Sequence, residues 1–152
     1  MNTVKYSHTN LIATDWKRLA KFYCDVFGCV QVGPRRTLSG DKLSDGTGVE
    51  NAQLEGVHLR LPGFGNQGPT LEIFQYLNNR DREAAHANSK GLTHIAFEVS
   101  NIDDICSKII QGGGWMLGKL VDYEIEGVGT CTFIYVRDPD RNIIEIQAWN
   151  KT

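Results

Sequence analysis

One short pattern occurs twice in this chain, and each copy contains one histidine and one glutamate. The first copy opens around His8 and closes around Glu72, and the second opens around His94 and closes around Glu145. Such a repeat predicts two similar structural units, because a single small sheet must cover its apolar face with a partner. The repeat therefore constrains both the fold and the placement of these four side chains.

Each copy continues with the same order of elements. Apolar residues recur at helical spacing from Trp16 to Phe27, and again from Ile102 to Ile110, and glycines follow both segments. Strand-like segments come before and after each helix, so each half has the pattern β-α-β-β-β. We expect an α+β fold of two tandem βαβββ modules that form a curved, half-open mixed sheet.

The division of the chain follows from this pattern. Residues 1–152 are expected to form a single domain, with module 1 at about 4–78, a linker at about 79–91 and module 2 at about 92–150. A chain of 152 residues is long enough to bury a core without disulfides. The segment 33–55 is polar and rich in glycine, and we interpret it as a long irregular loop inserted into module 1.

Composition excludes several classes of function. The net charge of −2 and the isoelectric point near 6.1 provide no broad basic surface, so neither nucleic acid nor a membrane is expected as a partner. No apolar stretch is long enough to cross a bilayer, and we expect a cytoplasmic protein. The four cysteines are scattered, with no Cys-x-x-Cys pair, and are interpreted as buried thiols rather than metal ligands.

The two histidines and two glutamates are candidate metal ligands. Side chains alternate between the faces of a strand, so His8 and Glu72 can point inward from one sheet, and His94 and Glu145 from the other. Imidazole and carboxylate without cysteine suit Mn, Fe, Co, Ni or Zn. A strand histidine is commonly an ordinary polar residue, but a glutamate buried in an apolar strand is costly unless it is paired. Their equivalent positions in the repeat favour one divalent metal ion in a cavity that the mixed sheet surrounds.

Other polar residues have simpler interpretations. His58 and His86 have no partner in the repeat and are interpreted as structural. Three basic residues lie in the segment 33–55 and either bind an anionic end of a substrate or are simply solvated: Arg35, Arg36 and Lys42.

Three segments carry a family resemblance. They are the His8 strand with Phe22-Tyr23-Cys24-Asp25-Val26-Phe27-Gly28, then Gly91-Leu92-Thr93-His94-Ile95-Ala96-Phe97, and lastly Val136-Arg137-Asp138-Pro139-Asp140-Arg141-Asn142-Ile143-Ile144-Glu145. In these segments the chain resembles the vicinal oxygen chelate superfamily, which contains glyoxalase I, methylmalonyl-CoA epimerase, extradiol dioxygenases and bleomycin- or fosfomycin-resistance proteins. The resemblance extends from about residue 5 to residue 149.

The resemblance implies a four-ligand site of the glyoxalase I type, with His8, Glu72, His94 and Glu145 as ligands. It implies proton-transfer chemistry of a lyase, isomerase or epimerase on a metal-chelated carbonyl substrate, through an enediolate or enolate. Glu145 would be the more mobile base, and Glu72 could act on the opposite face of the substrate. The family usually dimerises, so a homodimer is expected, with the site built from one chain or from two swapped chains.

The chain departs from the family pattern at two positions. Bacterial glyoxalase I carries an arginine and an asparagine that help to hold glutathione, and Ile12 and Tyr76 stand at the matching positions here. Glutathione is therefore not the expected substrate. Two alternatives stay open: an Fe(II) extradiol-type dioxygenase in which Glu72 binds no metal, and a non-enzymatic resistance protein that binds a small molecule or drug on the same scaffold.

Overall fold

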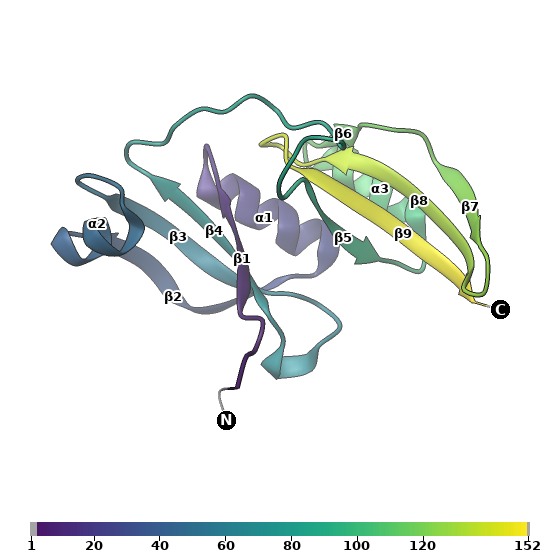
Figure 1. Ribbon diagram of the computed structural model, residues 1–152, viewed down its shortest axis with the longest axis horizontal. Helices are drawn as coiled ribbons and strands as arrows, with labels where there is room; N and C mark the ends of the chain where they lie inside the picture. The colour runs from purple at the N-terminus through teal and green to yellow at the C-terminus, as the bar shows by residue number, and fades with distance from the viewer. Residues whose placement is uncertain (1–2, 152) are drawn as a thin grey trace. The chain divides into compact units, whose positions relative to one another are not determined.

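The computed structural model describes residues 3–151. Contacts along the chain divide it into two compact units, residues 1–81 and residues 82–152. Each unit contains a mixed β-sheet and a long helix (Figure 1). The predicted α+β class and the two βαβββ-like modules with mixed sheets are confirmed.

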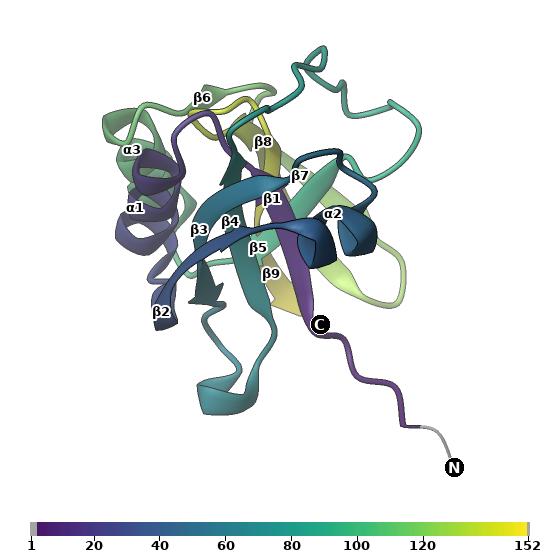
Figure 2. The ribbon, with the colours of Figure 1, turned by 90° about the vertical axis from the view of Figure 1, so that its left-hand side faces the viewer.

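The first unit contains a four-stranded sheet, in which the first strand is parallel to its neighbour and the other pairs are antiparallel. In spatial order the strands are β1 (His8–Ile12), β4 (Thr70–Tyr76), β3 (Gln53–Arg60) and β2 (Val30–Ser39). The helices are α1 (Trp16–Phe27), α2 (Asp41–Thr47) and the short 3₁₀ helix η1 (Gly65–Gln67). Helix α1 lies against one face of the sheet, on β3 and β4 (Figure 2).

The second unit repeats this plan with a five-stranded sheet. Its path is β5 (His94–Glu98), β9 (Ile143–Lys151), β8 (Gly129–Arg137) and β6 (Trp115–Met116), and β7 (Val121–Ile125) also pairs with β8. Strand β5 is parallel to β9, as β1 is to β4. Helix α3 (Ile102–Gln111) contacts β9 and β6.

Helices α1 and α3 form where the apolar spacing predicts them. Helix α1 begins after Asp15, whose carboxylate accepts hydrogen bonds from two backbone N–H groups of the first turn, and it ends at Gly28 with φ of 70°. Its buried face contains Leu19, Phe22, Tyr23 and Val26. Because α1 packs this apolar face against one face of the sheet, the polar side chains of the strands can lie on the other face of the sheet.

The interpretation of residues 33–55 as an irregular loop is wrong. Most of this segment belongs to strand β2, helix α2 and the start of strand β3. Strand β2 is an edge strand that is largely exposed, so it lacks the apolar alternation by which strands are recognised. The pairing register shifts between Val32 and Arg36, where Gly33 has φ of 69° and Pro34 has no N–H to donate. A bulge in an edge strand accommodates both residues.

The cysteines were expected to be buried thiols, and the structure buries two of the four. All four cysteines are free thiols; Cys29 and Cys131 are buried, and the other two are half-buried. Burial raises the pKa of Cys29 to about 12, so this thiol stays protonated at neutral pH. Among the described residues, no helix is long and apolar enough to cross a membrane.

Candidate metal centre

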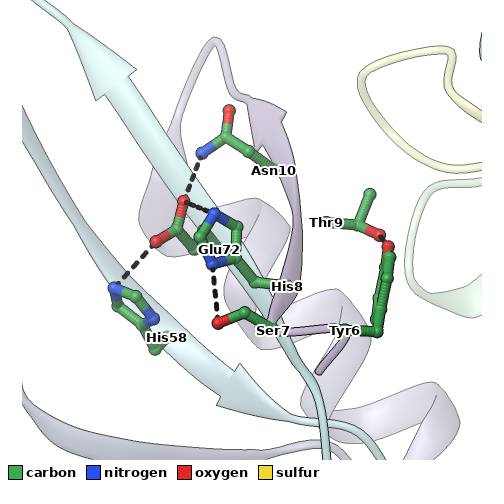
Figure 3. A network of polar contacts seen from close by, with 7 residues as sticks. All are labelled: Tyr6, Ser7, His8, Thr9, Asn10, His58 and Glu72. Carbon is green, nitrogen blue, oxygen red and sulfur yellow. Dashed lines mark hydrogen bonds and ion pairs between the residues drawn. The ribbon is translucent and has the colours of Figure 1, made fainter. Parts of the chain in front are cut away.

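In the first unit, His8 and Glu72 lie side by side on two parallel strands. The register of β1 and β4 pairs Asn10 with Glu72, and His8 lies two residues earlier on the same face of β1. The His8 Nε2 atom is 3.3 Å from Glu72 Oε2 (Figure 3). The Glu72 side chain is only 12% exposed, so this carboxylate needs polar partners, and it has them.

The second unit contains an equivalent pair. The register of β5 and β9 pairs Ala96 with Glu145, and His94 again lies two residues earlier. The His94 Nε2 atom is 3.2 Å from Glu145 Oε2, and the Glu145 side chain is 17% exposed. The His94 ring also packs against Tyr135, whose ring centroid is 5.0 Å away. The same backbone arrangement thus produces a histidine–glutamate pair in each unit.

The distance within each histidine–glutamate pair fits two neighbouring ligands of a divalent ion. With bonds of about 2.1 Å, adjacent ligand atoms of an octahedral ion are about 3 Å apart, close to the distances of 3.2 and 3.3 Å between histidine nitrogen and glutamate oxygen. A hydroxyl group lies at the other ring nitrogen of each histidine: Ser7 Oγ is 3.3 Å from His8 Nδ1, and Thr93 Oγ1 is 3.3 Å from His94 Nδ1. A hydroxyl at Nδ1 orients the ring, and where it accepts a hydrogen bond from Nδ1–H the Nε2 lone pair is free to bind an ion.

Each unit brings together half of the predicted ligand set. Within residues 3–151, no group of three or more histidine, cysteine, aspartate or glutamate side chains is arranged so that it could hold a metal ion. His8 and His58 both contact Glu72, His8 at Oε2 and His58 at Oε1. Within each unit, the structure therefore brings together two of the four predicted ligands.

His58 is the polar residue that the sequence interpretation missed. Its Nε2 atom is 3.2 Å from Glu72 Oε1, and its ring packs edge-on against Phe74. Burial lowers the pKa of His58, and this effect outweighs the opposing effect of Glu72, so a neutral imidazole that donates Nε2–H is favoured. His58 and Glu72 lie equally far in sequence from Gly65, which is in the connection between β3 and β4. In an antiparallel hairpin such residues face each other, so this spacing could have predicted the contact.

The basic residues of β2 are engaged locally. The Arg35 guanidinium pairs with Glu55 and lies over the Trp16 ring, and this ion pair lowers the pKa of Glu55. The Arg36 guanidinium donates to the carbonyl oxygen of Pro34 at 2.8 Å. The contacts of Arg35 link the edge strand β2 to β3 and to the start of α1.

The comparisons with known proteins agree on one family. Residues 5–146 match the model of the Glyoxalase/Bleomycin resistance protein/Dioxygenase superfamily. The chain is also 26% identical over 163 residues to a lactoylglutathione lyase of Schizosaccharomyces pombe; the match covers 100% of this chain and 50% of that enzyme. The chain thus spans about half the length of this curated relative.

Solved structures share the fold. A glyoxalase family protein from Bacillus cereus has a TM-score of 0.76 at 18% identity and is covered over 95% of its length, with 98% of this chain. A fosfomycin resistance protein from Listeria monocytogenes has a TM-score of 0.59 at 19% identity, with 99% of this chain and 96% of that chain covered. At such identities the likeness is one of architecture.

Proposed function

Since the chain belongs to the Glyoxalase/Bleomycin resistance protein/Dioxygenase superfamily, we propose that it is a divalent-metal-dependent, glyoxalase-like lyase or isomerase. The proposed ligands are His8, Glu72, His94 and Glu145, which bind one ion within one chain or between two chains of a homodimer. The supporting observation is that both units place a histidine nitrogen and a glutamate oxygen 3.2–3.3 Å apart at equivalent register positions. A metal site with only three protein ligands would not need a glutamate at position 72.

A divalent ion held by these four residues would supply Lewis acidity that polarises a carbonyl group of the substrate. Glu145 takes a proton from the carbon next to that carbonyl and returns it to a neighbouring atom, by way of an enediolate or enolate of the substrate. Among the described residues of its unit, Glu145 contacts His94 through Oε2, and we assign Oε1 as the oxygen that accepts the proton. His94 keeps its orientation through the Thr93 hydroxyl and the Tyr135 ring.

The face of the first sheet that carries His8 and Glu72 favours a substrate with an apolar part. Ile12 follows His8 and Asn10 on the same face of β1, and its side chain is exposed. Tyr76 follows Glu72 and Phe74 on the same face of β4. Neither Ile12 nor Tyr76 offers the charge or amide that a glutathione carboxylate would need, so we propose a small carbonyl substrate other than a glutathione adduct.

Exchange of substrate hydrogen with solvent is the direct test of this function. Protein reconstituted separately with Mn²⁺, Fe²⁺, Co²⁺, Ni²⁺ or Zn²⁺ would be incubated in D₂O with α-hydroxyketones, 2-oxoaldehydes and their thiol adducts. Nuclear magnetic resonance should show deuterium entering the carbon next to the carbonyl, at a rate that depends on the metal.

Two other results would contradict the proposal. Oxygen uptake with catechols by the Fe²⁺ form, without any exchange, would identify a dioxygenase. Tight binding of small aromatic compounds or drugs that survives His8→Ala, again without exchange, would identify a binding protein.

A further inference from the structure

Glu72 and Glu145 have different surroundings, although they occupy equivalent positions. Both oxygens of Glu72 are engaged: Oε2 contacts His8 and also accepts a hydrogen bond from Asn10 Nδ2 at 3.2 Å, and Oε1 contacts His58 at 3.2 Å (Figure 3). For Glu145, the described residues of its own unit give one ion-pair contact, from His94 to Oε2. Tyr135 and Cys131 lie nearby, and burial together with the Glu145 charge raises their pKa values. The Glu72 carboxylate thus has three hydrogen-bond or ion-pair partners, and the Glu145 carboxylate has one within the described part of its unit.

The register shows that this difference is built into the sequence. Strand β1 places Asn10 beside Glu72, and the equivalent residue beside Glu145 on β5 is Ala96. Strand β3 places His58 opposite Glu72, and the equivalent residue opposite Glu145 on β8 is Tyr135. In both positions the first unit has a donor that reaches the carboxylate. In the second unit, alanine has no side-chain donor. Tyr135 packs its ring on His94 and feels the charge of Glu145, but among the described residues it donates no hydrogen bond to that carboxylate.

We propose that Asn10 and His58 are positioning residues that lock Glu72 as a fixed metal ligand, so that proton transfer falls to Glu145 alone. This inference rests on the proposed function and assigns unequal roles to its two carboxylates. His58 holds Oε1 and leaves Oε2, the oxygen beside His8, to face the ion. Glu72 therefore binds through one oxygen and cannot turn toward the substrate without breaking two hydrogen bonds.

Cobalt binding to the metal-free protein tests this proposal without any substrate. Partners of a ligand contribute about 10- to 100-fold to metal affinity. Asn10→Ala and His58→Ala should each weaken Co²⁺ binding about 10-fold and change the visible absorption spectrum of the Co²⁺ form. His58→Gln, which retains an N–H donor, should recover most of the affinity. His86→Ala removes a histidine outside this cluster and should bind Co²⁺ as the wild type does.

The reverse change provides a second, independent readout. Ala96→Asn adds an amide at the position in the second unit that Asn10 occupies in the first, and Ala96 is exposed, so the larger side chain has room. This variant should bind Co²⁺ more tightly and lower hydrogen exchange in substrate, because Glu145 then gains the kind of partner that holds Glu72. Unfolding of the metal-free variants, followed by circular dichroism, should match that of the wild type.

The outcomes separate this inference from the proposed function. If the wild type binds no Co²⁺, or if Glu72→Ala binds it as tightly as the wild type, the ligand set is wrong and this inference fails with it. If Glu72→Ala weakens binding while His58→Ala and Asn10→Ala bind as the wild type does, the ligand set stands and only the positioning role is overturned.

Discussion

Glu145→Gln should lower turnover by about 10²- to 10⁴-fold while most of the bound metal remains. The amide keeps the size of the carboxylate and retains an oxygen that can face the ion. It cannot accept the proton, because an amide is a very weak base. Steady-state kinetics on the substrate that shows deuterium exchange, beside metal analysis of the same samples, would measure both effects.

Two matched variants sharpen this prediction. Glu124→Gln changes an exposed carboxylate of the same unit and should leave both turnover and metal content unchanged. Glu72→Gln should reduce metal affinity more than Glu145→Gln does, because Glu72 is the fixed ligand. Full turnover in Glu145→Gln with metal bound would show that another group takes the proton.

Asp138→Ala should destabilise the second unit by about 3 kcal/mol. The Asp138 side chain is fully buried in the turn between β8 and β9. Its Oδ1 accepts hydrogen bonds from the backbone N–H groups of Asp140 and Asn142, and its Oδ2 accepts one from Asn142 Nδ2, all at 2.8–2.9 Å. Alanine leaves these donors in the turn without their acceptor. Chemical denaturation followed by circular dichroism would measure the loss.

The same turn positions the proposed base. The β8–β9 register that it begins pairs Arg137 with Ile143 and Tyr135 with Glu145. Asp122→Ala is the control, since Asp122 is exposed and accepts one side-chain hydrogen bond, from Thr132 at 2.6 Å. It should cost less than about 1 kcal/mol. Equal losses in the two variants would show that the Asp138 turn contributes nothing special to stability.

The histidine–glutamate pairs could be anticipated from sequence because they depend on local rules. Side-chain alternation along a strand and the recurrence of one pattern suffice to put His8 with Glu72 and His94 with Glu145. Helices α1 and α3 were equally predictable, since Asp15 and Asn101 cap them and apolar spacing marks their buried faces.

The partners of Glu72 could not be anticipated in the same way. The contact between His58 and Glu72 depends on the exact register of β3 against β4, and a shift of one residue would point His58 to the other face. Strand β2 was not predicted from the sequence, for another reason. It is an exposed edge strand with a bulge at Gly33 and Pro34, so its sequence carries turn residues rather than alternation.

Metal content is the most direct test of the four-ligand account. Plasma mass spectrometry would be applied to untagged wild-type protein and to the His8→Ala, Glu72→Ala double variant, each as purified and after reloading with divalent ions. We predict about one Mn, Fe, Co, Ni or Zn ion per chain in the wild type and a large loss of metal in the variant. Metal that stays bound in the variant, or a wild type that cannot be loaded, would contradict it.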